Sequence, residues 1–197
     1  MKIKLFGINI YISVFFCALI AFLLIIDTTG FMSLSLIAIL IHESGHFVCM
    51  QKVGCTTRKI EMTLYGIIVT GSPFKTVKEE TLIAFFGPMF NLIAAVAAYC
   101  IGFLFENRYF YMFSMVNFAI GSINMLPVTG LDGGTVTYGI IRTMLKEHTA
   151  ELLCFWISII TIAVLIFFGV WVVFCKIPNP SVLLFAVYLL ILNILKQ

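Results

Sequence analysis

Long apolar runs separated by short polar breaks dominate this chain. They predict about six membrane-spanning helices, at residues 8–26, 31–51, 81–105, 109–127, 152–174 and 182–195. A transmembrane helix needs about 20 predominantly apolar residues, and these runs meet or approach that length. We therefore expect a single transmembrane domain over residues 1–197, with no internal repeat and no soluble domain.

The stretch 52–80 breaks this pattern, because charged side chains return and β-branched residues become dense. Gly66, Gly71 and Pro73 punctuate residues 60–73, and this favours a short strand pair over a helix. We expect an all-α membrane protein with one short membrane-associated β-hairpin after the second helix. The hairpin could pair with an extended substrate segment. A plain polar loop is the alternative interpretation.

Composition places the chain among integral membrane proteins. Of its 197 residues, 62% are hydrophobic and 11% are charged, and a soluble domain of this size cannot bury so much apolar surface. The net charge of +3 does not point to nucleic acid, so the lipid bilayer is the partner that composition indicates. The six cysteines form no C-x-x-C pair and are interpreted as small buried hydrophobes.

The positive charges predict an orientation. If the N-terminus is cytosolic, the outer loops hold only Arg108 and Lys176 of the 12 Lys and Arg residues. Because cytosolic loops are enriched in these residues, we expect a multi-pass membrane protein with both termini in the cytosol. No small-residue cleavage site precedes Asp27, so the first apolar run is expected to be a retained helix rather than a signal peptide.

One apolar run carries the chemistry. Residues 42–46 read His-Glu-Ser-Gly-His, and every other position in the span 31–51 is uncharged. On a helix, His42 and His46 lie one turn apart and face the same way, so they can hold one metal ion. Glu43 can then take a proton from a metal-bound water. Ionisable groups inside a membrane span are costly and mark function by default.

A catalytic zinc site usually has a third protein ligand. Among the carboxylates near cytosolic ends, Asp132 alone is embedded among apolar and glycine residues at the end of a span. We expect it to complete a site for one Zn²⁺ per chain. His148 is the competing candidate, although its charged neighbours indicate an interfacial surface. Cys49 follows His46 by about one helical turn and could also lie near the metal.

Three motifs occur in order: His42-Glu-Ser-Gly-His46, Gly87-Pro88-x-x-Asn91, and Asn124-x-x-Pro127-x-x-x-x-Asp132-Gly133. Together they resemble the signatures of the site-2 protease family of intramembrane zinc metalloproteases. The layout is most similar to the bacterial sporulation-type branch, which implies a bacterial cell membrane as the location. The chain stops at Gln197, so we expect it to lack the C-terminal regulatory nucleotide-binding domain of that branch.

The resemblance implies a metalloendopeptidase that cleaves a transmembrane or membrane-associated protein near the cytosolic side, in regulated intramembrane proteolysis. A regulatory membrane protein would be a further partner. The implied roles are metal ligand for His42, His46 and Asp132, catalytic base for Glu43, and substrate positioning for Asn124, Pro127 and Asn91.

Two other functions fit the same ionisable residues. In an ion or proton transporter, intramembrane His, Glu and Asp relay charge, but the outer halves of the predicted spans show almost no ionisable residues. A catalytically silent membrane binding protein could keep the metal as a structural staple. The presence of Glu43 argues against the staple, because a structural metal site has no need of a base.

Overall fold

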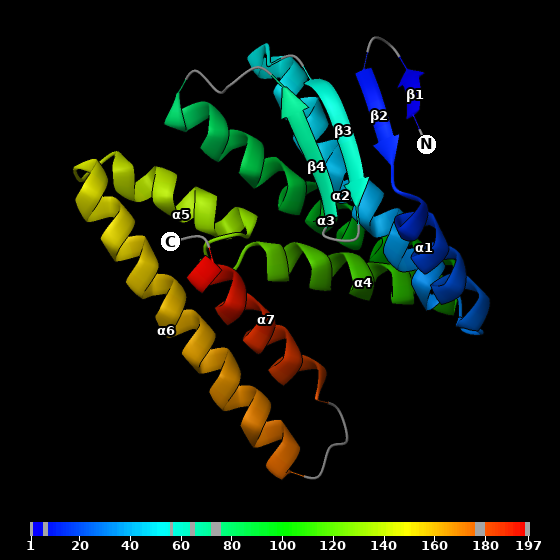
Figure 1. The fold of residues 1–197 in the computed structure, drawn as a ribbon. Coiled ribbons are helices and arrows are strands. Elements are labelled where there is room, and N and C mark those ends of the chain that lie inside the picture. Colours follow the sequence, from blue (N-terminus) through cyan, green and yellow to red (C-terminus); the bar gives the residue numbers. More distant parts are fainter. Residues whose placement is uncertain are drawn as a thin grey trace.

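The computed structural model describes residues 2–5, 8–55, 57–63, 66–71, 76–175 and 180–195. Four strands and seven helices follow one another in these ranges (Figure 1). The strands are β1 (Lys2–Leu5), β2 (Ile8–Ile12), β3 (Thr57–Thr63) and β4 (Gly66–Gly71). The helices are α1 (Val14–Ile26), α2 (Phe31–Val53), α3 (Val77–Phe105), α4 (Arg108–Asn124), α5 (Asp132–Arg142), α6 (Glu147–Phe174) and α7 (Ser181–Leu195).

The predicted fold class is wrong. The described part of the chain has seven helices rather than about six, and it is not all-α with a separate hairpin, because β1 to β4 form one sheet in the order β1-β2-β3-β4. Among the residues that the structure describes, three helices are long and apolar enough to cross a membrane, namely α2, α3 and α6. The prediction from hydropathy was wrong because an apolar run does not by itself distinguish a strand or a short helix from a membrane-spanning helix.

The first predicted span, 8–26, divides into a strand and a helix. Residues Ile8–Ile12 read Ile-Asn-Ile-Tyr-Ile, which alternates with the two-residue period of a strand. This strand runs parallel to β3, with Asn9 opposite Lys59. The helix that follows has 13 residues. At about 1.5 Å per residue it is shorter than the ~30 Å hydrocarbon core of a bilayer.

A tight turn before α2 sets the start of the helix that carries the His-Glu motif. The Asp27 carboxylate accepts hydrogen bonds from the Thr29 hydroxyl at 2.7 Å and from the Met32 backbone N–H at 2.7 Å. These bonds stabilise the charged form, so they lower the pKa of Asp27, with the Thr29 hydroxyl as the main cause. The carboxylate also sits at the positive end of the α2 dipole.

Helix α3 begins at Val77, four residues before the predicted span, because a capping box starts it. The Thr76 hydroxyl accepts from the Glu79 backbone N–H at 3.2 Å, and the Glu79 carboxylate accepts from the Thr76 N–H at 3.3 Å. The sequence Thr-x-x-Glu carries this signal. A search for apolar runs misses it because the cap is polar.

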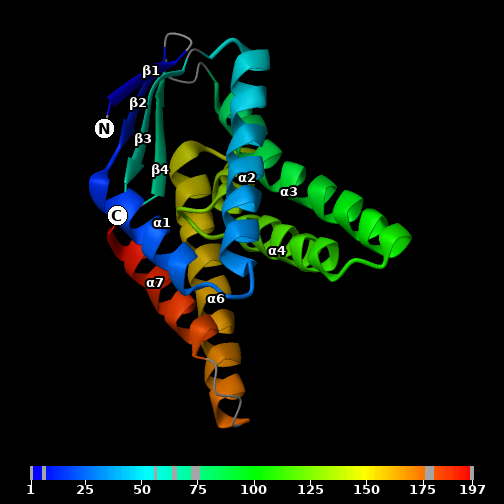
Figure 2. The same ribbon diagram turned by 90° about the vertical axis from the view of Figure 1, so that its right-hand side faces the viewer.

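The helices form two groups that meet near the start of α5. Helices α2, α3 and α4 contact one another, and α5 packs against α3 (Figures 1 and 2). Helices α6 and α7 form an antiparallel pair that extends away from this bundle. Val128, just before α5, is buried against Ile162 of α6 and Leu189 of α7. The segment leading into α5 is therefore fixed by both groups.

Candidate metal centre

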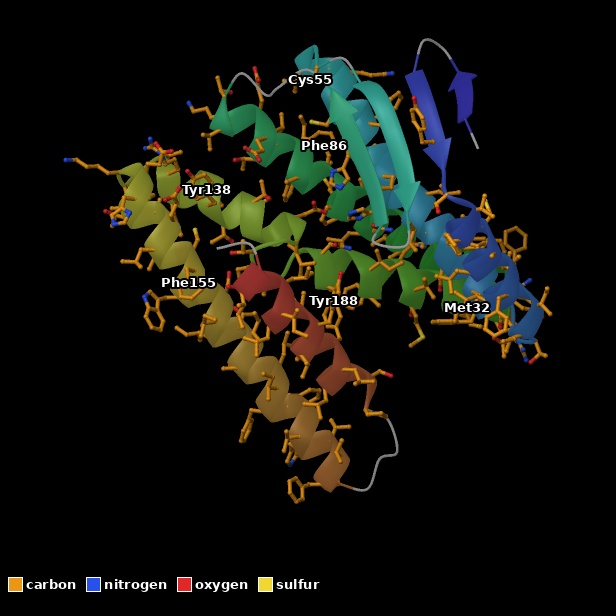
Figure 3. All side chains as sticks on the ribbon, in the orientation of Figure 1. Met32, Cys55, Phe86, Tyr138, Phe155 and Tyr188 are labelled. Atoms are coloured by element: carbon orange, nitrogen blue, oxygen red, sulfur yellow. The ribbon has the colours of Figure 1, made fainter. Side chains whose placement is uncertain are left out.

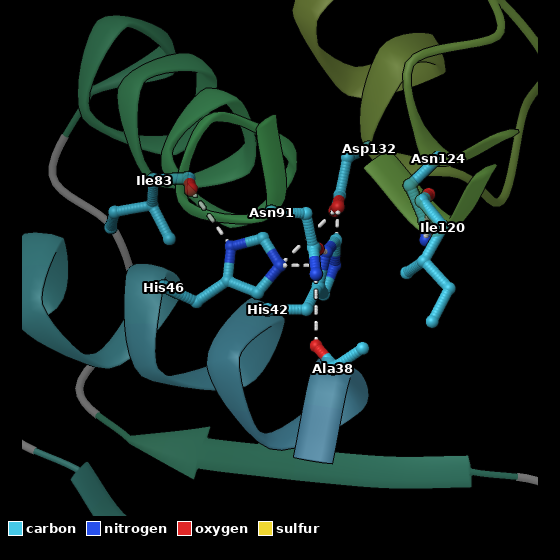
Figure 4. A network of polar contacts seen from close by, with 8 residues as sticks. All are labelled: Ala38, His42, His46, Ile83, Asn91, Ile120, Asn124 and Asp132. Atoms are coloured by element: carbon cyan, nitrogen blue, oxygen red, sulfur yellow. Dashed lines mark hydrogen bonds and ion pairs between the residues drawn. The ribbon is translucent and has the colours of Figure 1, made fainter. Parts of the chain in front are cut away.

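Three potential metal ligands meet where α2 faces the first residue of α5 (Figure 4). His42 Nε2 lies 2.9 Å from Asp132 Oδ2, and His46 Nε2 lies 3.3 Å from the same oxygen. The two Nε2 atoms are 3.1 Å apart. The one-turn spacing on α2 brings the two rings together, whereas Asp132 arrives from a distant part of the sequence.

The start of α5 is held by close backbone packing. A Cβ on Gly133 would overlap the carbonyl groups of Met125 and Leu126, so glycine lets the incoming chain cross the helix start. The backbone N–H of Thr129 also donates to the Ser158 hydroxyl of α6 at 2.9 Å. These contacts fix the backbone on both sides of Asp132 and so place its carboxylate.

The hydrogen bond of His46 determines which of its ring nitrogens carries the proton. His46 Nδ1 lies 2.8 Å from the Ile83 carbonyl oxygen of α3. A carbonyl oxygen only accepts, so Nδ1 is the donor and Nε2 of the neutral ring keeps its lone pair. Gly87 lies over the same ring, where a Cβ would overlap it. Helix α3 therefore both approaches and orients this imidazole.

His42 is oriented in the same way by Asn91. The Asn91 amide donates to the Ala38 carbonyl and to Asn117 Oδ1, both at 2.9 Å. Its own Oδ1 therefore faces His42 Nδ1, 2.7 Å away, and accepts from it. Asn91 and Asn117 are both 0% exposed. This buried amide chain leaves the Nε2 lone pair of His42 directed toward His46 and Asp132.

The lone pairs of the two imidazoles and the Asp132 carboxylate therefore form a site that suits a cation. With both Nδ1 atoms acting as donors, the two Nε2 atoms and Asp132 Oδ2 converge with no proton between them. Asp132 Oδ2 is buried and has no hydrogen-bond donor among the described residues. Two imidazoles and a carboxylate are a usual ligand set for catalytic zinc, with the second ring nitrogen bonded to a carbonyl or amide oxygen.

Glu43 lies beside this group rather than in it. Its side chain is partly buried, and it interacts electrostatically with His46, His42 and Asp132. In the described part of the chain its carboxylate has no hydrogen-bond partner. As the residue after His42 it projects about 100° around the helix. This position leaves it available to accept a proton near an open coordination position.

The other sequence candidates occupy different places. Asn124 ends α4 beside Asp132, and its amide donates to the Ile120 carbonyl at 3.0 Å (Figure 4). The Pro127 carbonyl accepts from the Ser158 hydroxyl at 3.4 Å. His148 is exposed on the first turn of α6, and Cys49 is buried in α2; the metal-ligand group found among the described residues contains neither.

Sequence reasoning missed the groups that orient the ligands. The substrate-positioning role predicted for Asn91 stays a prediction, and the structure adds a contact that the sequence does not indicate: the Asn91 side chain is fully buried and bonded to His42. Asn117 and Ser158 were not considered, although each is a polar residue inside an otherwise apolar helix and is buried in the structure. Their isolation among apolar neighbours was the available signal.

No protein-family model matches the chain. Two curated proteins are similar in sequence. Stage IV sporulation protein FB of Bacillus subtilis is 26% identical over 149 residues, which cover 71% of this chain and 49% of that protein. Zinc metalloprotease MJ0392 of Methanocaldococcus jannaschii is 27% identical over 154 residues, covering 70% and 44%. The chain thus spans about half the length of the curated relatives it matches.

A solved structure matches almost the whole chain. The site-2 protease from Methanocaldococcus jannaschii superposes with a TM-score of 0.67 at 19% identity, covering 96% of this chain and 91% of that one. The fold is that of a site-2 protease. The resemblance predicted from the three motifs is confirmed, at low sequence identity. In this site-2 protease fold, the His-Glu motif and Asp132 lie at the meeting point of α2 and α5.

Proposed function

We propose that this chain is an intramembrane zinc metalloprotease that cleaves a membrane-embedded or membrane-associated protein. The observation that carries the proposal is the approach of Asp132, the first residue of α5, to His42 and His46 on α2, a helix apolar enough to cross a membrane. Asp132 Oδ2 has no hydrogen bond among the described residues and is therefore available to a metal ion. The relatives support it, since one is named a zinc metalloprotease and the similar structure is a site-2 protease.

Different residues of the site have different roles in peptide hydrolysis. Held by His42, His46 and Asp132, zinc would supply Lewis-acid polarisation of a carbonyl and a water that ionises near neutral pH. The Glu43 carboxylate, beside the ligand group, would accept the proton of the attacking water and give a proton to the leaving amine as the carbon–nitrogen bond breaks. The buried bonds from Asn91 and the Ile83 carbonyl keep both imidazoles directed at the site throughout.

The substrate must be extended at the cleaved bond, because helical carbonyls are already hydrogen-bonded and shielded. Asn124 stands beside Asp132 (Figure 4), and its Oδ1 takes no part in the hydrogen bond that its Nδ2 donates to the Ile120 carbonyl. We assign Asn124 to bonding the substrate backbone there. We also assign Pro127, in the segment before α5, to substrate positioning.

The proposal is tested with the purified protein in liposomes that contain a single-span reporter. We expect the reporter to be cut within or beside its apolar segment, and mass spectrometry of the two fragments locates the bond. A reporter that stays intact with zinc-loaded protein, under conditions where its span is accessible, would contradict the proposal.

Replacing Asn91 by leucine is expected to weaken zinc binding about 10- to 100-fold, because the His42 ring loses the acceptor that orients it. A chelator competition assay measures the affinity. Asn107→Ala is the matched control, since Asn107 caps the remote start of α4 by accepting from the Tyr109 N–H. Equal zinc affinity for Asn91→Leu and the control would show that this hydrogen bond does not support the site.

The three long apolar helices in the described part of the chain indicate a membrane protein. We further propose a multi-pass arrangement with both termini in the cytosol, on the distribution of Lys and Arg. Reporter fusions after Gln197 should be active only on the cytosolic side. Activity only on the outer side would reverse the topology.

A further inference from the structure

A cavity of about 820 Å³ lies against the metal centre, between α3, α5, α6 and α7. Asp132 lines it and also belongs to the metal-ligand group. Figure 3 labels two other lining residues, Tyr138 on α5 and Phe155 on α6. One water needs about 30 Å³, so the cavity is far larger than a path for single waters. Its volume is typical of ligand pockets, which run from about 300 to 1,000 Å³.

One wall of this cavity holds a buried amide with no partner. Asn193, near the end of α7, is 2% exposed, and neither its Nδ2 nor its Oδ1 has a hydrogen bond within the described residues. Burying an unpaired donor and acceptor is destabilising. Leu189, one turn earlier on α7, is buried in the apolar cluster with Val128 and Ile162. The rigid packing of α7 therefore holds the amide in place without satisfying it.

The chemistry of Asn193 matches a peptide group. Its amide offers a donor and an acceptor side by side, as a backbone N–H and C=O do, and a chain entering the cavity in extended form has these groups unpaired. A substrate of a protease in this fold must be extended near the cleaved bond. Asp132 lines the same cavity as Asn193, so a bond cleaved at the metal centre lies beside the cavity.

The charge of the cavity adds a preference. Its described lining contains the carboxylates of Glu80, Asp132 and Glu151 and no Lys or Arg. Glu80 lies in the first turn of α3 and Glu151 in the second turn of α6, and both are exposed. His148 is the one lining residue that can carry a positive charge. Such a lining favours a basic side chain, the kind enriched at the cytosolic flank of membrane spans.

We propose that this cavity binds an extended segment of the substrate next to the cleaved bond. Asn193 pairs with a peptide group of that segment, and Glu80 and Glu151 favour a lysine or arginine on it. The inference rests on the proposed protease function and adds a specificity site to it. No covalent step is involved.

Binding is tested without turnover, in the metal-loaded Glu43→Gln protein, with a fluorescent 12-residue peptide that carries one central lysine. Asn193→Leu should weaken peptide binding about tenfold, because two neutral hydrogen bonds are lost. Its melting temperature should stay the same or rise, since an unpaired amide is removed from the interior. Tyr188→Phe removes a polar atom from the outer face of the same helix, where Tyr188 is 52% exposed, and should bind as the parent does.

The charge preference has its own comparison. The parent protein should bind the lysine peptide about fivefold more tightly than the same peptide with glutamate, as expected for partly exposed charge pairs. Glu80→Gln with Glu151→Gln should remove that difference. Glu106→Gln, in the turn after α3, makes the same chemical change at a position outside the described lining and should preserve the difference.

The outcomes separate this inference from the proposed function. Wild-type protein that binds zinc and cleaves, while Asn193→Leu binds peptide as tightly as its parent, overturns the site and leaves the protease standing. If Asn193→Leu binds peptide tightly but cleaves slowly, the Asn193 amide acts by bonding water rather than the substrate backbone. That result would also overturn the proposed peptide site. Wild-type protein that neither binds zinc nor cleaves refutes the proposed function itself.

Discussion

Replacing Glu43 by glutamine is expected to lower the cleavage rate about 10²- to 10⁴-fold and to leave zinc in place. Glutamine keeps the size of the side chain but cannot accept the proton from water, and general-base catalysis contributes about that factor. Zinc should persist because Glu43 lies outside the metal-ligand group of His42, His46 and Asp132. The measurement is cleavage of a membrane-embedded reporter in liposomes, with zinc content determined on the same preparations.

Glu106→Gln is the control for this substitution. It makes the same change in the turn after α3, and it should cleave at the wild-type rate with the same zinc content. A Glu43→Gln protein that also cleaves at the wild-type rate would show that Glu43 is not the base. Loss of zinc together with activity would show instead that Glu43 supports the metal.

Replacing both His42 and His46 by alanine is expected to remove the metal altogether, from one zinc per chain to none. Two of the three ligands disappear, and one carboxylate cannot hold zinc in their absence. Cleavage should fall below detection. Elemental analysis after gel filtration measures the metal, and the His148→Ala protein is the matched control because His148 lies on α6 outside the ligand group. That control should keep its zinc.

Asp132→Asn should bind zinc more weakly than the wild type but more tightly than the double histidine variant, since a neutral amide is a weaker ligand than a carboxylate. Zinc affinity and activity should then drop together. Full zinc in the double histidine variant would place the metal elsewhere. Full zinc and full activity in Asp132→Asn would mean that another residue is the third ligand.

Local spacing explains why part of the site could be read from the sequence. His42 and His46 lie one turn apart on one helix, so their convergence needs no tertiary information. Asp132 stood out because it is a lone carboxylate among apolar and glycine residues. Its approach to the histidines depends on the packing of residues 125–131 against α5 and α6, which no local pattern contains.

The role of Asn91 could not be read in the same way. The family resemblance implies that Asn91 positions substrate, which stays a prediction, and the structure adds that its buried amide is bonded to His42, Ala38 and Asn117. Such a role depends on which helices cross, and only the fold reveals that. Asn193 is similar, because its burial beside a cavity follows from the packing of α7 against α6.

The helices α2, α3 and α6 were predictable because each is a long apolar run. The pairing of β2 with β3 was not predictable, since α1 and α2 separate these two strands in the sequence and only the tertiary fold brings them together. The run 8–26 contains no charged residue and is mostly apolar. Its hydropathy therefore concealed the change from a strand to a helix.

The most direct test of the central claim is a zinc titration of stripped protein. The purified chain is freed of metal with a chelator, reconstituted in liposomes, and given increasing zinc while reporter cleavage is followed. We predict no cleavage without zinc and a rise in rate that ends at one bound zinc per chain, with no rise in the His42→Ala, His46→Ala protein. Equal cleavage by the stripped and the zinc-loaded protein would contradict the claim.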